Sequence, residues 1–67
     1  MLTRREMEVL DLIVEGYTNT EISDKLMITK HTTKAHVASI FQKMGVSNRV
    51  QATVKYLKQH YSDQLSL

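Results

Sequence analysis

Cysteine and proline are absent from this chain of 67 residues, and glycine occurs only twice. The absence of cysteine excludes a disulfide framework and a thiolate metal site. The scarcity of proline and glycine, which interrupt helices, favours an all-α domain. No apolar run approaches the roughly 20 residues that a membrane-spanning helix needs, and the N-terminus lacks the pattern of a signal peptide. We therefore expect one small cytoplasmic domain over residues 1–67.

The charged residues are distributed unevenly along the chain. Residues 1–24 carry six acidic and two basic side chains, whereas residues 25–62 carry seven basic side chains and no acidic one. A surface of one sign attracts phosphate groups and steers association with polyanions. The alternative is a chance gathering of lysines near helix C-termini, where the helix dipole favours them. We interpret the asymmetry as favouring a nucleic-acid partner.

Capping signals predict four helices. Three polar residues are followed three positions later by Glu or Gln, as in a capping box: Thr3 with Glu6, Thr18 with Glu21, and Asn48 with Gln51. Thr29 is the predicted N-cap of a further helix, and Gly16 and Gly45 are predicted left-handed stops. The expected fold is a four-helix bundle with helices at about residues 3–15, 19–26, 30–44 and 48–60, followed by a frayed tail.

The predicted helix 30–44 has two different faces. Helical spacing gathers an apolar stripe on one side, formed by Val37, Ile40, Phe41 and Met44. The opposite side is polar or very small and has no carboxylate: it consists of His31, Lys34, Ala35, Ala38 and Gln42. Alanines allow close approach of another molecule, and cationic side chains suit a polyanion. This face is therefore predicted to enter a DNA groove, the alternative being the solvated basic side of an ordinary amphipathic helix.

The predicted last helix also has two apolar sides. Val50, Val54 and Leu57 lie on one side, with Tyr61, while Ala52 and Tyr56 point elsewhere. In so small a domain one side faces the core and the other is exposed, which favours pairing with a partner helix. The alternative is a helix that is covered on both sides.

A short helix, a tight turn and a longer helix with a polar exposed face are typical of a helix-turn-helix. Four motifs specify the pattern further: Leu2-Thr3-x-Arg5-Glu6, Gly16 followed by Asn19-x-Glu21-Ile22, Thr32-Thr33-Lys34-x-His36-Val37, and Lys43-Met44-x-Val46 followed by Arg49. With these motifs, residues 2–58 resemble the DNA-binding domain of the LuxR/FixJ/NarL family. Two residues depart from the family pattern: Ser23, where alanine is usual, and Thr33, where valine is usual and the side chain faces the core.

The resemblance implies a bacterial transcription regulator that binds double-stranded DNA as a dimer, with its third helix in the major groove and no cofactor or metal. It implies base contacts from Lys34, Ala35 and Ala38, and His31, on the same face of the helix, is a further candidate. It implies phosphate contacts from Lys30, Thr32 and Lys43 and from backbone amides near the helix starts at Asn19 and Thr29. Arg49, the arginine of the last motif, is a further candidate for a phosphate contact. It also implies a dimer interface at Val50, Val54 and Leu57. Because the chain begins at the first motif, we expect the C-terminal output domain of a two-component response regulator, the alternative being an intact small regulator.

Other functions have weaker support in the sequence. His31 and His36 are separated by about 140° around a helix, so they do not form a shared metal or proton-transfer site. No glycine-rich phosphate loop or nucleophile motif is present, so we expect no enzyme. RNA binding lacks an aromatic stacking platform. The alternative kept open is a helical protein-interaction module that contacts the transcription machinery, such as RNA polymerase, without DNA specificity of its own.

Overall fold

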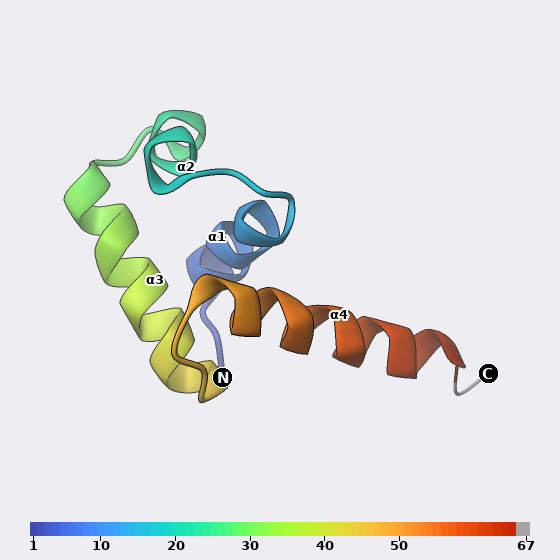
Figure 1. Ribbon diagram of the computed structural model, residues 1–67. Coiled ribbons are helices and arrows are strands. Elements are labelled where there is room, and N and C mark those ends of the chain that lie inside the picture. The colour runs from blue at the N-terminus through green and yellow to red at the C-terminus, as the bar shows by residue number, and fades with distance from the viewer. Residues whose placement is uncertain (66–67) are drawn as a thin grey trace.

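The computed structural model describes the backbone of residues 1–65 and the side chains of residues 1–60. In this part of the chain there are four helices and no strand: α1 (Arg4–Val14), α2 (Asn19–Leu26), α3 (Lys30–Met44) and α4 (Arg49–Leu65). α1 contacts each of the other three helices. Figure 1 shows α1 nearly end-on between α2, α3 and α4. The all-α, four-helix prediction is confirmed.

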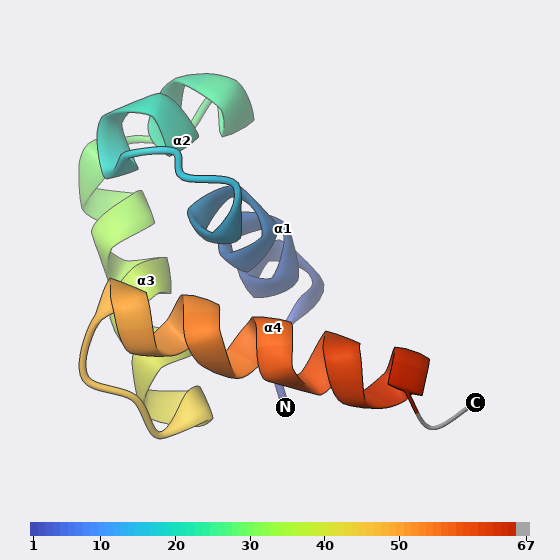
Figure 2. The ribbon, with the colours of Figure 1, turned by 45° about the vertical axis from the view of Figure 1, so that its right-hand side comes forward.

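The predicted end of the fourth helix was wrong. We expected a helix over about 48–60 and a frayed tail, but α4 continues to Leu65. After Gly45 the sequence contains neither glycine nor proline, so nothing local ends the helix. The C-terminal part of α4 consequently projects beyond the other helices (Figures 1 and 2). The expected place of Tyr61 on the apolar stripe concerns a side chain outside the described residues.

The first two helices begin with the predicted capping boxes. Thr3 Oγ1 accepts from the Glu6 amide at 3.1 Å, and Glu6 Oε1 accepts from the Thr3 amide at 2.8 Å. The corresponding distances for Thr18 and Glu21 are 3.2 and 2.8 Å. Each box satisfies two amides that a helix start leaves without a backbone partner, so these helix starts follow from local sequence alone.

The starts of α3 and α4 differ from this pattern. Thr29 caps α3, as predicted, by accepting from the Thr32 amide at 3.0 Å. At α4, Asn48 Oδ1 accepts from the Gln51 amide at 2.9 Å, but Gln51 Oε1 accepts from the amide of Ser47 at 2.7 Å. The predicted box at α4 is therefore half formed, and its return bond goes one residue further back.

The core lies where α1, α2 and α3 meet, with one small residue from α4. Its buried apolar side chains are Val9, Leu10, Ile13, Ile22, Val37, Ile40 and Ala52. Tyr56 of α4 packs against this cluster. The buried side of α4 is therefore the Ala52 and Tyr56 side, which leaves the other apolar side at the surface.

The two residues that depart from the family pattern contact each other. Ser23 and Thr33 are both buried, and their hydroxyl oxygens are 2.7 Å apart. The backbone carbonyl of Asn19 is also within reach of the Ser23 hydroxyl, and that of Thr29 within reach of the Thr33 hydroxyl. Each hydroxyl has a single proton, which it donates either to its carbonyl or to the other hydroxyl, so two of the three contacts are hydrogen bonds at any time. Neither hydroxyl is buried without a hydrogen bond. The pair joins α2 to α3 within the helix-turn-helix.

The turn between α2 and α3 passes through Met27, which has φ 56° and ψ 45°. The left-handed region costs a residue with a Cβ about 1–2 kcal/mol, and glycine adopts it freely. The Met27 side chain is 91% exposed and so loses few contacts if removed. We expect Met27→Gly to stabilise the fold by about 1 kcal/mol, measured by thermal unfolding. Met27→Ala, which keeps the Cβ, is the matched control and should show no such gain; equal gains in both variants would contradict the backbone explanation.

Candidate nucleic-acid interface

The outer face of α3 is at the surface. His31, Lys34, Ala35 and Ala38 are all exposed, while Thr33, Val37 and Ile40 on the other side of the helix are buried. Figure 1 shows α3 along one edge of the molecule, with the other helices on one side of it only. The two alanines keep the centre of this face shallow, and α3 carries no carboxylate. A groove edge can therefore approach the helix closely, between cationic or polar side chains.

The N-terminus of α3 adds donors beside this face. The hydroxyl of Thr29, the N-cap, donates to that of Thr32 in the first turn at 2.9 Å, and Lys30 lies between them in the chain. Thr29 and Lys30 are exposed, and Thr32 is half-buried. A helix N-terminus carries partial positive charge and outward amides, which favour an anion such as phosphate.

Arg49 links α4 to the start of α2. Its Nη1 donates to the carbonyl of Tyr17 at 3.0 Å, and its Nη2 donates to Asn19 Oδ1 at 2.5 Å. The side chain is half-buried. Both contacts lie within the molecule, and neither was predicted from the sequence. One signal was available, because a basic residue in the first turn of a helix opposes the helix dipole and so points to another partner.

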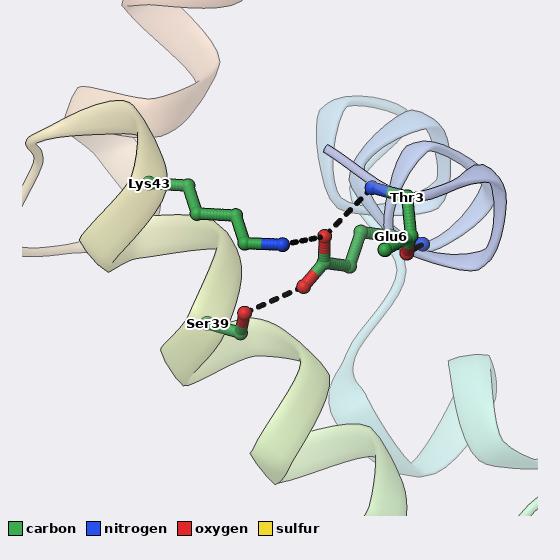
Figure 3. Close-up of polar contacts among 4 residues, drawn as sticks. All are labelled: Thr3, Glu6, Ser39 and Lys43. Atoms are coloured by element: carbon green, nitrogen blue, oxygen red, sulfur yellow. Dashed lines mark hydrogen bonds and ion pairs between the residues drawn. The ribbon is translucent and has the colours of Figure 1, made fainter. Parts of the chain in front are cut away.

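Glu6 is the centre of a polar network that sequence reasoning missed (Figure 3). It is only 4% exposed. Oε1 of Glu6 accepts from Lys43 Nζ at 2.8 Å, and Oε2 accepts from Ser39 Oγ at 2.5 Å. The Lys43 ammonium, followed by the Ser39 hydroxyl and the Thr3 amide, holds the pKa of Glu6 down from 4.5 to about 2. The network fastens the start of α1 to the C-terminal half of α3.

This network also concerns a predicted phosphate ligand. Lys43 was expected to contact DNA, and the structure places its ammonium on Glu6 with 36% of the side chain exposed. Ser39 and Lys43 are four residues apart and therefore share one face of α3. This spacing was a sign in the sequence that both side chains contact the same residue. Glu6 had been assigned only to the capping box.

The exposed stripe on α4 is formed by Val50, Val54 and Leu57, which are 71%, 44% and 42% exposed. On the buried side of the helix, the Tyr56 hydroxyl donates to Asp11 of α1 at 3.2 Å. Figure 2 shows α4 lying across one end of the domain with a long face turned away from the other helices. The three side chains are apolar and exposed on one side of α4, and exposed apolar patches often mark interaction sites.

Within the described residues, no three His, Asp or Glu side chains gather closely enough to hold a metal ion. None of the helices, over the same part of the chain, combines the length and the apolar character needed to cross a bilayer.

The short α2, the tight turn at Met27 and the exposed, carboxylate-free face of α3 define a helix-turn-helix DNA-binding domain. The family model for bacterial regulatory proteins of the luxR family matches residues 1–56. The chain belongs to this family, as its motifs indicated.

Relatives and solved structures agree with this assignment. The chain is 50% identical over 58 residues to the transcriptional regulatory protein DegU of Brevibacillus brevis, covering 87% of this chain and 25% of DegU. It is 49% identical over 59 residues to LiaR of Bacillus subtilis strain 168, covering 88% of this chain and 28% of LiaR. It thus spans about a quarter of the length of the curated relatives it matches.

Two solved response-regulator structures have the same fold. The DNA-binding domain of the response regulator ComA, solved in complex with the anti-activator RapF, is 37% identical with a TM-score of 0.78; the match covers 81% of this chain and 93% of that one. The response regulator ChrA of a heme-sensing two-component system is 35% identical with a TM-score of 0.84, over 90% of this chain and 30% of ChrA. The chain is a DNA-binding domain homologous to the output domains of response regulators.

Proposed function

We propose that this chain binds a specific double-stranded DNA sequence as part of a bacterial transcription regulator, with the outer face of α3 in the major groove. The observation that carries the proposal is the exposed surface of Lys34, Ala35 and Ala38, which is shallow and cationic. The major groove is wide enough for a helix, and its base edges carry the pattern that distinguishes one sequence from another.

Each residue of this face has a role that follows from its chemistry. Lys34 donates to O6 and N7 of a guanine, which is a common specific contact of basic side chains. Ala35 and Ala38 meet thymine methyl groups, since a small apolar side chain permits that approach. His31, one turn before Ala35, contacts a base at the edge of the site. With a single long cationic side chain at the centre, the face reads few base pairs by hydrogen bonds.

Phosphate contacts flank this face. Thr29, Lys30 and Thr32 form one group at the N-terminus of α3, and Asn19 marks the second at the N-terminus of α2. Contacts of this kind set the position of the protein on the duplex and supply affinity that depends on salt. Lys43 and Arg49 were also expected to contact phosphates, but both side chains are hydrogen-bonded within the molecule, Lys43 to Glu6 and Arg49 to the start of α2.

The larger assembly is part of the same proposal. Two copies pair on DNA through the α4 stripe of Val50, Val54 and Leu57, so that each α3 reads one half-site. The complete protein is a cytoplasmic response regulator in which this chain is the output domain. The exposed acidic residues of α1 and its C-cap, which are Glu8, Asp11 and Glu15, are the surface available to RNA polymerase.

Lys34→Ala and Lys30→Ala form a matched pair that tests the assignment of base and phosphate contacts. Lys34→Ala should cost about 1–3 kcal/mol on the cognate site and relax the preference at one base pair. Lys30→Ala should weaken all sequences alike and lower the salt slope by about one. Titrations of a labelled duplex and of single-base variants at several salt concentrations measure both effects. Equal losses on cognate and random DNA for Lys34→Ala would move Lys34 to the phosphates.

The same titrations distinguish DNA binding from a protein-interaction module. A domain that neutralises several phosphates releases the ions condensed on them, so its affinity falls steeply with salt. We expect that steep fall for the unaltered chain. Absence of duplex binding, or an affinity that does not change with salt, would favour the interaction module that contacts the transcription machinery.

A further inference from the structure

We propose that Arg49 is a positioning residue for DNA binding, which acts by fixing the orientation of the Asn19 side-chain amide. The inference rests on the proposed DNA-binding function and refines it. It assigns Arg49 a role inside the molecule in place of the direct phosphate contact expected from the sequence. The side-chain amide of Asn19 is then the group that contacts a DNA phosphate.

The Arg49 side chain bridges two helices, α2 and α4, that do not pack against each other in the described part of the chain. In the described residues, no Cα atom of α2 lies within 8 Å of a Cα atom of α4. The guanidinium of Arg49 nevertheless reaches both the Tyr17 carbonyl, just before α2, and Asn19 Oδ1, in its first turn. One long side chain thus connects α4 to the start of α2, the first helix of the helix-turn-helix.

An arginine at the start of α4 carries two costs in free energy. Arg49 is the first residue of α4, where the helix dipole disfavours positive charge. The side chain is also half-buried, so part of its hydration is lost. Two hydrogen bonds from a charged donor offset both costs, because charge-assisted bonds are stronger than neutral ones. With both bonds made, the end of the side chain is committed to the α1–α2 connection.

The hydrogen bond from Arg49 fixes the direction in which the Asn19 side-chain amide faces. A guanidinium has only donors, so it accepts nothing and requires the oxygen of Asn19 to face it. The NH2 group is bonded to the same carbon, on the side opposite the oxygen, so it points away from Arg49. An NH2 group is a donor, and a phosphate oxygen is an acceptor. Without Arg49 the amide is free to rotate and to present its oxygen, which repels phosphate.

The orientation of Asn19 matters because of where it lies. Asn19 is the first residue of α2, directly after the N-cap Thr18. Its side-chain amide therefore lies at a helix end whose outward amides and partial positive charge favour an anion. A correctly turned Asn19 supplies one more donor to the phosphate proposed there, and a reversed one removes it.

A double-mutant cycle with Arg49→Met and Asn19→Ala tests the inference in the whole chain. Each single variant should bind the cognate duplex about three- to tenfold more weakly, as expected for one hydrogen bond. The double variant should bind little worse than either single one, because both changes remove the same contact. The salt slope should change by much less than the 0.9 or so expected for a lost phosphate contact in Arg49→Met. Thermal unfolding of each variant sets a temperature at which all are folded.

Arg49→Lys and a spectroscopic measurement complete the design. Lysine keeps the charge and can still donate to Asn19 Oδ1, so it should recover part of the affinity. In nitrogen-15 spectra, the side-chain NH2 signal of Asn19 should shift when duplex is added to the unaltered chain and should shift less in Arg49→Met. A change in stability alone would not move this signal.

Three results would overturn the inference. Additive losses with a salt slope lowered by about one would place Arg49 on a phosphate. Full affinity in a folded Arg49→Met variant would leave Arg49 with a stabilising role only. An Asn19 NH2 signal that ignores DNA would remove Asn19 from the interface. In all three cases the unaltered chain still binds duplex, whereas loss of that binding would overturn the proposed function itself and this inference with it.

Discussion

Val54→Glu is expected to abolish cooperative binding to paired half-sites while leaving the domain folded. Val54 lies in the centre of the exposed stripe between Val50 and Leu57 and is 44% exposed, so the isolated domain tolerates a charge there. In the proposed dimer the same position is covered, and a carboxylate without a partner is costly to bury. Two linked sites commonly gain 10²–10⁴ in affinity over one, so the loss on paired sites should be on the order of 10² or more.

Binding to one and to two half-sites separates this effect from unfolding. Affinity for a single half-site should change little in Val54→Glu, and the melting temperature should stay near that of the unaltered chain. Gln59→Glu is the matched control, because Gln59 is exposed on the other side of α4. A collapse of the fold in Val54→Glu would show that the stripe belongs to the core, and equal losses in both variants would point to a general charge effect on DNA binding.

Glu6→Gln should lower the stability of the fold at neutral pH and remove much of its acid sensitivity. The folded pKa of Glu6 is about 2 against an ordinary value of 4.5. A lowered folded pKa stabilises the fold above the unfolded pKa, and this stabilisation is lost as pH falls from about 4.5 toward 2. Because glutamine carries no charge, the bonds from Lys43 and Ser39 lose their charge-assisted part at every pH.

Unfolding curves between pH 7 and pH 2 measure this prediction. The difference in stability between the unaltered chain and Glu6→Gln should be largest near neutrality and should shrink through the window from 4.5 to 2. Glu8→Gln is the control, since Glu8 forms a surface ion pair with Arg5 at 3.3 Å. A difference that stays constant with pH would show that Glu6 contributes as a hydrogen-bond acceptor and capping residue, independent of its charge.

The features that the sequence predicted are those that local chemistry determines. Thr3 and Thr18 cap their helices because the partner glutamate is three residues away in each case. Gly16 and Gly45 adopt the left-handed conformation that ends a helix. The polar face of α3 follows from helical spacing alone, and it lies at the surface as expected.

The features that were missed depend on which segments meet in space. Glu6 lies 37 residues from Lys43 and 33 from Ser39, so no local pattern connects them. Arg49 and Asn19 are 30 residues apart and do not share an element. Spacing on α4 separates the Val50 side from the Ala52 side but does not say which one faces α1. Met27 was not anticipated as a left-handed residue because methionine has no preference for that conformation.

Chemical-shift mapping by NMR is the most direct test of where DNA lies on this domain. Backbone amide signals of the nitrogen-15-labelled chain are followed while a cognate duplex, found by selection from random sequences, is added. The largest changes should fall on His31, Lys34, Ala35 and Ala38, with smaller ones at the starts of α2 and α3. Changes confined to α1 or α4, with the outer face of α3 unaffected, would contradict the placement of α3 in the major groove.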